Sequence, residues 1–247
     1  MSDSIIYGRN SVMEALKAGR DLEKIYILKD ASSGSVPAIR RMAKAQRIPV
    51  QETDRKKLDE MTSENHQGVI ALASAVNYAE VSDILLRAEE AKEPPFLLIC
   101  ESIQDPHNLG AMIRSAEALG VHGIIISRHH AVGLSDAVAK TAAGALEYLP
   151  VAKVSSIPKL LDDLKKQGIW IACADMDGQT VYRTDLTGPM ALVIGGEHEG
   201  ITRLVKEKCD FVVGIPMRGS VNSLNASVAC GVLLYEIARQ RQDRGQG

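Results

Sequence analysis

The sequence predicts an α/β protein, in which a parallel sheet with helices on both faces is preceded by a small α/β domain. Short continuous apolar runs, such as residues 96–100, recur through the second half of the chain between stretches of helical periodicity. Strands that are apolar on both sides are typical of parallel sheets covered by helices on both faces. Shorter helices and strands alternate over the first 75 residues, which indicates a separate small domain.

The composition limits the possible partners and the compartment. The chain has 247 residues, of which 45% are apolar and 24% charged, as in an ordinary globular protein. We expect a cytoplasmic protein without a membrane segment, because there is no leader-like N-terminus and no apolar run near the ~20 residues of a membrane span. The net charge of −2 excludes a uniformly basic nucleic-acid binder, so a polyanion would have to meet local basic patches.

The first domain, residues 1–75, is expected to alternate helices and strands. Its elements are a helix over 11–16 capped by Asn10, a strand over 24–28, a helix over 36–46, a strand over 48–52, a helix that opens at 55 and a strand over 68–73. The exposed side of the 36–46 helix carries Arg40, Arg41 and Lys44. These charges fit either a solvated helix face or contacts with phosphates, and the pattern alone leaves both open.

The second domain is expected over residues 94–247, after a connection over 76–93 that consists of a linker, 76–80, and a leading helix, 81–92. Its parallel sheet should have five or six strands. These lie over 96–100, 123–126, 151–154, 169–173, 191–194 and 211–215, with helices near 110–119, 135–142 and 157–167, one from 201 and one over 224–240.

The last of these helices is apolar nearly all round between Ala226 and Ala238. A helix without a polar face is buried, either in the core of its own domain or in a contact between subunits. We favour a subunit interface, because the small residues Ala226, Ala229 and Gly231 allow close contact between helices.

Three polar segments follow strands of the predicted sheet, at the edge where open α/β sheets place their sites. The first, residues 101–116, contains Asn108, which can cap the following helix, and Arg114, which is either a structural ion-pair partner or an active-site cation. The second contains Gly195, Gly196 and Glu197. The glycines either let a ligand approach the backbone or serve a turn that needs positive φ, and Glu197 could accept from a ribose or base, or hold Arg114.

The third segment joins a buried strand to the last helix through a loop of Gly, Ser and Asn residues, 216–225. Its Ser223 and Asn225 form either an ordinary helix cap or part of a ligand site at a helix N-terminus. The dinucleotide fingerprint, the P-loop and the serine-hydrolase elbow are all absent from the sequence. Backbone N–H groups, amides, a carboxylate and one arginine suit the positioning of an already activated donor against an acceptor.

The cysteines and histidines do not indicate a metal site. Cys100, Cys173, Cys209 and Cys230 are far apart and without CxxC spacing, so we expect reduced core residues. The pair His129-His130 has no acidic or cysteine partner nearby in sequence and is more typical of a solvated or RNA-facing loop.

Taken together, the three segments resemble a known family. Residues 108–114 within ESIQDPHNLGAMIRSAEALG, then GGEHEGI and IPMRGSVNSLNASVA, resemble motifs 1, 2 and 3 of the SpoU (TrmH-like) class of SPOUT RNA 2′-O-ribose methyltransferases, over residues 96–240. Residues 6–16 and 66–69 resemble the small ribosomal-protein-like substrate-binding domain of the RlmB-like 23S rRNA guanosine-2′-O-methyltransferases.

The resemblance implies S-adenosylmethionine as cofactor, a C-terminal trefoil knot and a homodimer through the C-terminal domain, and we expect no metal because the sequence has no Cys/His ligand spacing. It implies methyl transfer to a ribose 2′-hydroxyl of rRNA, most simply a guanosine of 23S rRNA, free or in a ribosome precursor. The alternatives are the same reaction on tRNA or another rRNA nucleotide, a catalytically silent RNA-binding or assembly factor, and a methyltransferase for a small molecule.

The resemblance also assigns roles to residues. The catalytic residues would be Arg114, Asn108, Glu197, Ser223 and Asn225, and the cofactor would lie against Ile194, Gly195, Gly196, Ile215, Met217, Leu224 and Asn225. We expect the RNA to meet Arg114 and the basic side chains of the first domain, Arg9, Arg40, Arg41 and Lys44. An arginine is a poor base at neutral pH. Arg114 is therefore better suited to hold a phosphate and stabilise a developing alkoxide than to remove a proton.

Overall fold

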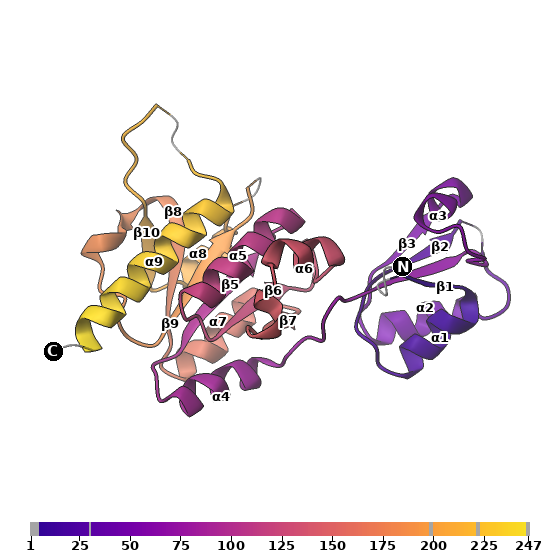
Figure 1. The fold of residues 1–247 in the computed structure, drawn as a ribbon, viewed down its shortest axis with the longest axis horizontal. Coiled ribbons are helices and arrows are strands. Elements are labelled where there is room, and N and C mark those ends of the chain that lie inside the picture. The colour runs from indigo at the N-terminus through magenta and orange to yellow at the C-terminus, as the bar shows by residue number, and fades with distance from the viewer. Residues whose placement is uncertain (1–4, 30, 198–199, 221–222, 246–247) are drawn as a thin grey trace. The chain divides into compact units, whose positions relative to one another are not determined.

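The computed structural model of the chain describes residues 5–29, 31–197, 200–220 and 223–245. The chain divides into two compact units (Figure 1). Met1–Asn77 and Leu134–Asp136 form the first unit, and Tyr78–Gly133 and Ala137–Gly247 form the second.

The first unit is a four-stranded mixed sheet with three helices. Its elements are β1 (Ile5–Tyr7), α1 (Arg9–Lys17), β2 (Leu22–Leu28), α2 (Val36–Ala45), β3 (Val50–Thr53), α3 (Arg55–Met61) and β4 (Val69–Ala73), with strand order β1-β4-β2-β3. Strands β2 and β3 are parallel, whereas β4 runs antiparallel to β1 and β2. The apolar sides of α1 and α2 pack on the sheet through Val12, Leu16 and Ile39, which are buried.

The start of α1 differs from the sequence prediction. The helix begins at Arg9, and Gly8 occupies the N-cap position with φ 88°. Glycine adopts this left-handed backbone without the steric cost that a side chain would add. Asn10 therefore lies inside the first turn of the helix, and the prediction that it caps α1 was wrong.

The second unit is a six-stranded parallel sheet with order β10-β8-β9-β5-β6-β7. Its elements are α4 (Val81–Ala91), β5 (Phe96–Glu101), α5 (Pro106–Ala118), β6 (Gly123–Ser127), α6 (Asp136–Ala142), β7 (Val151–Val154), α7 (Ile157–Lys166), β8 (Trp170–Thr180), β9 (Met190–Gly195), α8 (Arg203–Lys208), β10 (Phe211–Gly214) and α9 (Ala226–Gly245), with 3₁₀ turns at Ala145–Glu147 and Val181–Arg183. The predicted α/β class and the parallel sheet are confirmed.

Helices cover both faces of this sheet (Figure 1). Alternate strand residues such as Leu97 and Ile99 pack with α4, α7 and α8 in one core, to which Ile84, Leu161 and Val205 contribute. On the opposite face, α5 packs against α9, and Met112 of α5 lies 3.8 Å from Cys100 of β5, measured between the sulfur atoms. A strand must be apolar on both sides to fill two such layers, which explains the continuous runs in the sequence.

Strand β8 is longer than predicted. It continues past Cys173 to Thr180, although the added residues include Asp175, Asp177 and Gly178. The extension is held by β10, which pairs first with Ala172 and Cys173 and then, after a register shift, with Gln179 and Thr180. Pairing with a neighbouring strand overrides the low strand propensity of Asp and Gly, a preference that depends on context.

The predicted linker, residues 76–80, is partly ordered on the second unit. Ala79 forms a bridge to Ala152 of β7, and its N–H donates to the Val151 carbonyl over 2.9 Å. Glu80 begins α4 through a capping box with Asp83. The ammonium of Lys153 lies 4.6 Å from the centre of the Tyr78 ring. Tyr78 to Glu80 therefore belong to the second unit.

Helix α9 has one buried and one exposed side. Cys230, Leu233, Leu234 and Ile237 are buried against the rest of the unit. A Cβ added at Gly231 would lie 3.8 Å from the Ser115 hydroxyl of α5, an ordinary contact distance, so packing within the chain does not require a glycine there. Three apolar residues on the other side, Val228, Val232 and Tyr235, are 50%, 42% and 62% exposed. Among the residues that the structure describes, no helix is both long enough and apolar enough to cross a bilayer.

Candidate functional site

The carboxyl ends of β5, β9 and β10 bring the three polar segments to one edge of the sheet. Strand pairing places Glu101 beside Gly195, and the loop after β10 leads to the start of α9. Three side chains meet there. The Asn108 amide donates to Glu197 Oε1 over 2.9 Å, and the Asn225 amide donates to the same oxygen over 2.7 Å and to Asn108 Oδ1 over 3.0 Å. Each segment thus contributes one residue to a single polar centre.

Asn225 also caps α9. Its Oδ1 accepts from the backbone N–H of Ser227 over 2.9 Å and of Val228 over 3.3 Å, and from the Ser227 hydroxyl over 2.6 Å. The two backbone N–H groups, of Ser227 and Val228, are among those that the first turn of a helix leaves without a partner. The cap and the ligand-site interpretations of this asparagine are therefore compatible, because the carbonyl end of the amide serves the first and the NH₂ end serves the polar centre.

The sequence suggested that Asn108 caps α5, but the structure shows that it does not. Asp105 occupies the N-cap position and its Oδ1 accepts from the His107 N–H over 2.9 Å, while Pro106 takes the first helical position. Proline is favoured there because its missing N–H is not needed. Asn108 lies within the first turn, only 6% exposed, with its side chain in the polar centre.

Gly195 and Gly196 are required for a reason that the sequence did not indicate. Neither belongs to the residues with positive φ, whereas Gly200 does, with φ 62°. A Cβ at Gly195 would overlap the backbone of Gly200 and Ile201, and one at Gly196 would overlap the Ser102 carbonyl. The two glycines thus let the chain pack against itself. The buried Glu101 fixes the same turn, because its carboxylate accepts from the Thr202 N–H and hydroxyl over 3.1 and 2.8 Å.

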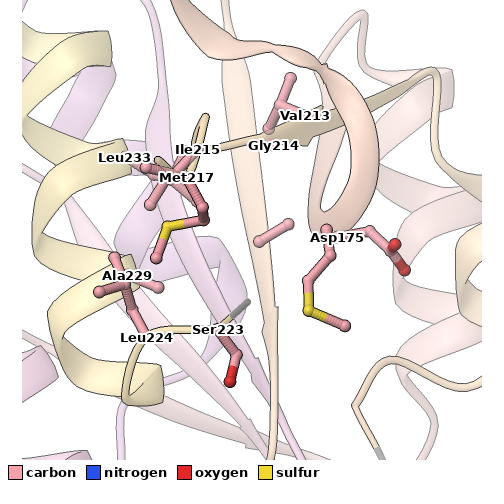
Figure 2. Close-up of a pocket in the computed structure, with 11 residues that line it drawn as sticks. Asp175, Val213, Gly214, Ile215, Met217, Ser223, Leu224, Ala229 and Leu233 are labelled. Atoms are coloured by element: carbon pink, nitrogen blue, oxygen red, sulfur yellow. The ribbon is translucent and has the colours of Figure 1, made fainter. Parts of the chain in front are cut away.

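Two adjoining pockets open beside the polar centre. One, of about 490 Å³, lies between the end of β8, the loop after β10 and the start of α9 (Figure 2). Figure 2 shows Met217, Leu224 and Leu233 on the α9 side of this pocket, with Ser223 below them. The other, of about 950 Å³, is shared with β9 and the polar centre, and both pockets are lined by Ser223 and Leu224.

All seven residues expected to contact the cofactor line these pockets. Ile215, Met217 and Leu224 line the first, and Ile194, Gly195, Gly196, Leu224 and Asn225 line the second. The first pocket is lined mostly by aliphatic side chains and backbone, whereas the second also has the polar side chains of Glu197 and Asn225 in its lining. A mostly apolar pocket with a few convergent polar groups is typical of sites for small molecules and cofactors.

The sequence missed the contribution of β8. Ala174, Asp175 and Met176 line the first pocket, beyond the predicted end of this strand at Cys173. The carboxylate of Asp175 points away from the pocket in Figure 2 and pairs with Lys206 over 2.6 Å. The hydrogen bond from Lys206 holds the pKa of the Asp175 carboxyl below its ordinary value. The available signal was the change from an apolar run to alternating Asp residues directly after Cys173.

Arg114 lies apart from the polar centre. Its side chain is exposed, and it has no hydrogen bond or ion pair with any other described residue. Asn108 and Arg114 are separated by six residues on α5, which corresponds to about 9 Å along the helix and about 240° around it. The two side chains therefore point in different directions, and Glu197 of the same chain does not hold Arg114. The structural ion pair considered for Arg114 is not found in the described part of the chain.

The basic residues of the first unit fall into two groups. Arg40 pairs with Glu52 over 2.8 Å, and Arg9 donates to the backbone carbonyls of Gln67 and Ser33 over 3.0 and 3.3 Å. Arg41 and Lys44 are exposed on α2 and have no partner among the described residues. Of the expected RNA contacts in this unit, these two are the most available to a ligand.

The four cysteines are free. Burial raises the pKa of the Cys100 thiol to about 12 and keeps that of Cys230 well above its ordinary value. Such thiols stay protonated and are inert near neutral pH. The described residues contain no group of three or more His, Cys, Asp or Glu side chains arranged to hold a metal ion.

Comparison with known protein families covers both units. The sequence model of the SpoU rRNA Methylase family matches residues 95–235, and a model described as RNA 2′-O ribose methyltransferase substrate binding matches residues 5–79. Among curated proteins, the chain is 46% identical to the putative TrmH family tRNA/rRNA methyltransferase YacO of Bacillus subtilis over 242 residues, covering 98% of this chain and 97% of that one. It is 41% identical to a putative TrmH family tRNA/rRNA methyltransferase of Staphylococcus aureus (strain MSSA476), with both chains fully covered.

Solved structures resemble the chain over most of its length. The SpoU methyltransferase AviRb of Streptomyces viridochromogenes, crystallised in complex with AdoMet, is 26% identical with a TM-score of 0.62 and covers 97% of this chain and 90% of its own. The A. aeolicus TrmH/SpoU tRNA modifying enzyme is 25% identical with a TM-score of 0.58 and covers 66% of this chain and 86% of its own.

Proposed function

The chain belongs to the SpoU rRNA methylase family, and from this we propose that it transfers a methyl group from S-adenosylmethionine to a ribose 2′-hydroxyl of ribosomal RNA. The observation that carries the proposal is the polar centre of Asn108, Glu197 and Asn225 beside a pocket at the sheet edge that Glu197 and Asn225 help to line. The family relationship explains why these three residues, far apart in the sequence, are brought together.

The pockets suit S-adenosylmethionine, which the related AviRb binds in its crystal structure. The aliphatic side chains of Ile215, Met217 and Leu224 can cover an adenine ring, and backbone groups of Gly195 and Gly196 line the same space. The bound cofactor supplies an activated methyl group on a sulfonium. The chain itself binds and orients the two reactants and excludes water from between them.

We assign Arg114 to the RNA rather than to the internal structure of the protein. It is an exposed cation without a partner in the described chain, and a guanidinium binds phosphate through two parallel N–H donors. Placed near the acceptor ribose, it would stabilise the alkoxide that forms as the hydroxyl attacks. Glu197 accepts from both amides and so fixes Asn108 and Asn225, while the exposed Ser223 lines both pockets as a further polar group.

We propose that the substrate is ribosomal RNA, and in the first instance a guanosine of 23S rRNA. The enzyme would act in the cytoplasm, on free rRNA or on a ribosome precursor. Two observations support a separate RNA-binding surface on the first unit: the substrate-binding model matches residues 5–79, and Arg41 and Lys44 are exposed on α2. A tRNA substrate is the second candidate, because the curated relatives are named for both RNAs and one similar structure is a tRNA modifying enzyme.

We also propose a homodimer through the second unit, and the C-terminal knot implied by the family resemblance. Two features support the dimer. The apolar residues Val228, Val232 and Tyr235 are exposed along one side of α9. Arg114 points away from Asn108 on its own helix, so an Arg114 of a second subunit is the better placed to meet the polar centre.

The test is methyl transfer from tritiated S-adenosylmethionine to rRNA isolated from a strain that lacks this gene, followed by mapping of the labelled nucleotide. Label on a single ribose is expected. Arg114→Ala should lower kcat by roughly 100-fold or more, as expected when transition-state charge stabilisation is lost. Binding of S-adenosylmethionine, measured by calorimetry, should be unchanged in this variant.

Lys166→Ala serves as the matched control, because Lys166 is an exposed cation at the far end of α7 with only a surface ion pair to Asp163. It should methylate at the wild-type rate. Label on tRNA and not on rRNA would favour the second candidate. Cofactor binding without label on rRNA, ribosome precursors or tRNA would contradict the proposal, and unchanged activity of Arg114→Ala would contradict the role given to this residue.

A further inference from the structure

The loop that follows β6 carries three consecutive basic or titratable residues that have no role in the site described above. We define this segment, residues 127–133, as the β6 loop. It contains Arg128, His129 and His130, and both histidines are exposed. None of the three forms an ion pair with a described residue.

The β6 loop lies at the same edge of the sheet as the polar centre. Cys100 of β5 pairs with Ile126 of β6 on one side and with Ile194 of β9 on the other. Neighbouring strands lie about 4.8 Å apart, so the end of β6 is about 10 Å from the end of β9. The β6 loop is therefore within the reach of an RNA whose acceptor ribose occupies the polar centre.

The β6 loop is held firmly on both sides. The Arg128 N–H donates to the Val154 carbonyl over 2.8 Å, and the Ser127 hydroxyl donates to the His129 carbonyl over 2.8 Å. The Val132 N–H donates over 2.8 Å to the carbonyl of Ile103, a residue that lines a pocket of about 660 Å³ beside Asn108 and Glu197. His130 has φ 57°, a conformation that is uncommon for a residue with a side chain. Such strain is kept only where the surrounding structure fixes it, and it is concentrated at functional sites.

Arg128 lacks the acceptors that its side chain requires. Its Nε is buried and has no hydrogen-bond partner, and its other guanidinium nitrogens make no hydrogen bond within the described chain. A guanidinium has five N–H donors and no acceptor, and buried donors without partners are rare in folded proteins. The Arg128 side chain is partly exposed, so its remaining guanidinium nitrogens are open to an outside group that supplies acceptor oxygens and, to balance the charge, is an anion.

We propose that the β6 loop binds a backbone phosphate of the RNA, next to the nucleotide that is methylated, through Arg128 with His129 and His130 at its rim. This inference rests on the function proposed above and adds an RNA contact on the second unit to those expected from α2. Phosphate is favoured over a base because the cluster offers donors and positive charge, the features by which proteins position nucleic-acid backbones. A phosphate contact would fix the register of the RNA on the sheet edge without specifying its sequence.

Two variants test the proposal in the full-length protein. Arg128→Gln removes the charge, and the double variant His129→Gln, His130→Asn removes the rim while keeping a residue that tolerates positive φ at position 130. The probe is rRNA from a strain that lacks this gene, with binding measured by filter retention over a series of salt concentrations. Lys166→Gln is the control, since it removes an exposed positive charge at the C-terminal end of α7.

Arg128→Gln should weaken RNA binding roughly tenfold, the usual effect of losing a hydrogen bond to a charged group. The slope of log affinity against log salt should fall by about one unit, the change expected when one phosphate contact is lost. KM for RNA should rise in proportion, with kcat and S-adenosylmethionine binding unchanged. The double variant should weaken RNA binding in the same direction, because it removes ring N–H donors at the rim, and this measurement serves as the test if Arg128→Gln does not fold.

Unchanged RNA affinity and salt slope in the folded variants would overturn the proposal. So would a fall in kcat with KM unchanged, because it would indicate a role in the reaction rather than in phosphate binding. These outcomes are distinct from failure of the proposed function itself. In that case, the wild-type protein would transfer no label to any RNA, whatever the affinity of the variants.

Discussion

Asn225 uses the two ends of one amide for two different tasks. Its carbonyl oxygen accepts from the first-turn N–H groups of Ser227 and Val228, and its NH₂ group donates to Glu197 and Asn108. Few other side chains can do both, because a cap needs an acceptor and the Glu197 carboxylate needs a donor. The residue therefore couples the start of α9 to the geometry of the polar centre.

Substitutions at Asn225 should separate these two tasks. Asn225→Asp keeps a capping oxygen but replaces the NH₂ donor with a carboxylate beside Glu197, so methyl transfer should be lost while the cap is retained. Asn225→Ala should abolish both the cap and methyl transfer, and the missing cap should lower the free energy of unfolding by about 1 kcal/mol. Urea denaturation and methyl-transfer rates measure the two effects. Wild-type activity of Asn225→Asp would mean that the amide donors are not needed.

Single residues were only partly predictable from the sequence. The motif resemblance selected Asn108, Glu197 and Asn225, and the structure brings them into hydrogen-bond contact. Their local roles were less accessible, because Asp, Asn and Gly near a helix start can exchange the capping position by a few residues. The sequence therefore predicts a cap at Asn108, whereas Asp105 provides it. The need for Gly195 and Gly196 depends on backbone segments that meet only after folding.

At the scale of elements, α9 contributes to both the core and the surface of its unit. Its buried side packs against α5 and the sheet, and its opposite side exposes Val228, Val232 and Tyr235. Exposed apolar residues that are grouped along one helix mark an interaction surface more often than scattered ones do. The helix thus fits both interpretations of its apolar sequence, one for each side.

A charge on the exposed side of α9 should prevent the proposed dimer. Val232→Glu would bury an unpaired carboxylate in the contact between subunits, which is costly. Sedimentation velocity should find a dimer for the wild type and a monomer for this variant. Leu204→Glu on α8 is the matched control, since Leu204 is a 54% exposed apolar residue outside α9. A monomeric wild-type protein, or a dimeric Val232→Glu variant, would contradict the interface.

The elements themselves were the most predictable part of the fold. Each strand of the parallel sheet overlaps one of the predicted apolar runs, because a strand covered on both faces must be apolar on both. The end of β8 was missed because it depends on pairing with β10, which is distant in sequence. The strand order likewise depends on contacts that no local pattern contains.

At the scale of the whole molecule, the second unit holds the site and the first unit adds RNA contacts of its own in the function that we propose. The polar centre and both pockets consist of residues from the second unit, whereas the matched substrate-binding segment lies in the first. Arg41 and Lys44, which have no ion-pair partner among the residues that the structure describes, lie on α2 of the first unit. Affinity for RNA and affinity for the cofactor should therefore respond to different substitutions.

Charge reversal on α2 tests this division. The double variant Arg41→Glu, Lys44→Glu should raise KM for RNA by roughly tenfold or more and reduce the salt dependence of binding, since two phosphate contacts are replaced by repulsion. Its affinity for S-adenosylmethionine should stay at the wild-type value. Lys56→Glu, Lys57→Glu on α3 is the control, with the same change in charge on another helix of the unit. An equal rise of KM for RNA in both double variants would mean that the effect comes from the net charge of the protein rather than from α2.

The place of Asn225 in the chain has a consequence for the timing of synthesis. Asn225 is synthesised 28 residues after Glu197 and 117 residues after Asn108. A nascent chain that has not yet reached Asn225 lacks the third member of the polar centre and one wall of both pockets. The site therefore forms only once this residue and α9 have left the ribosome, and a chain truncated before Asn225 lacks it.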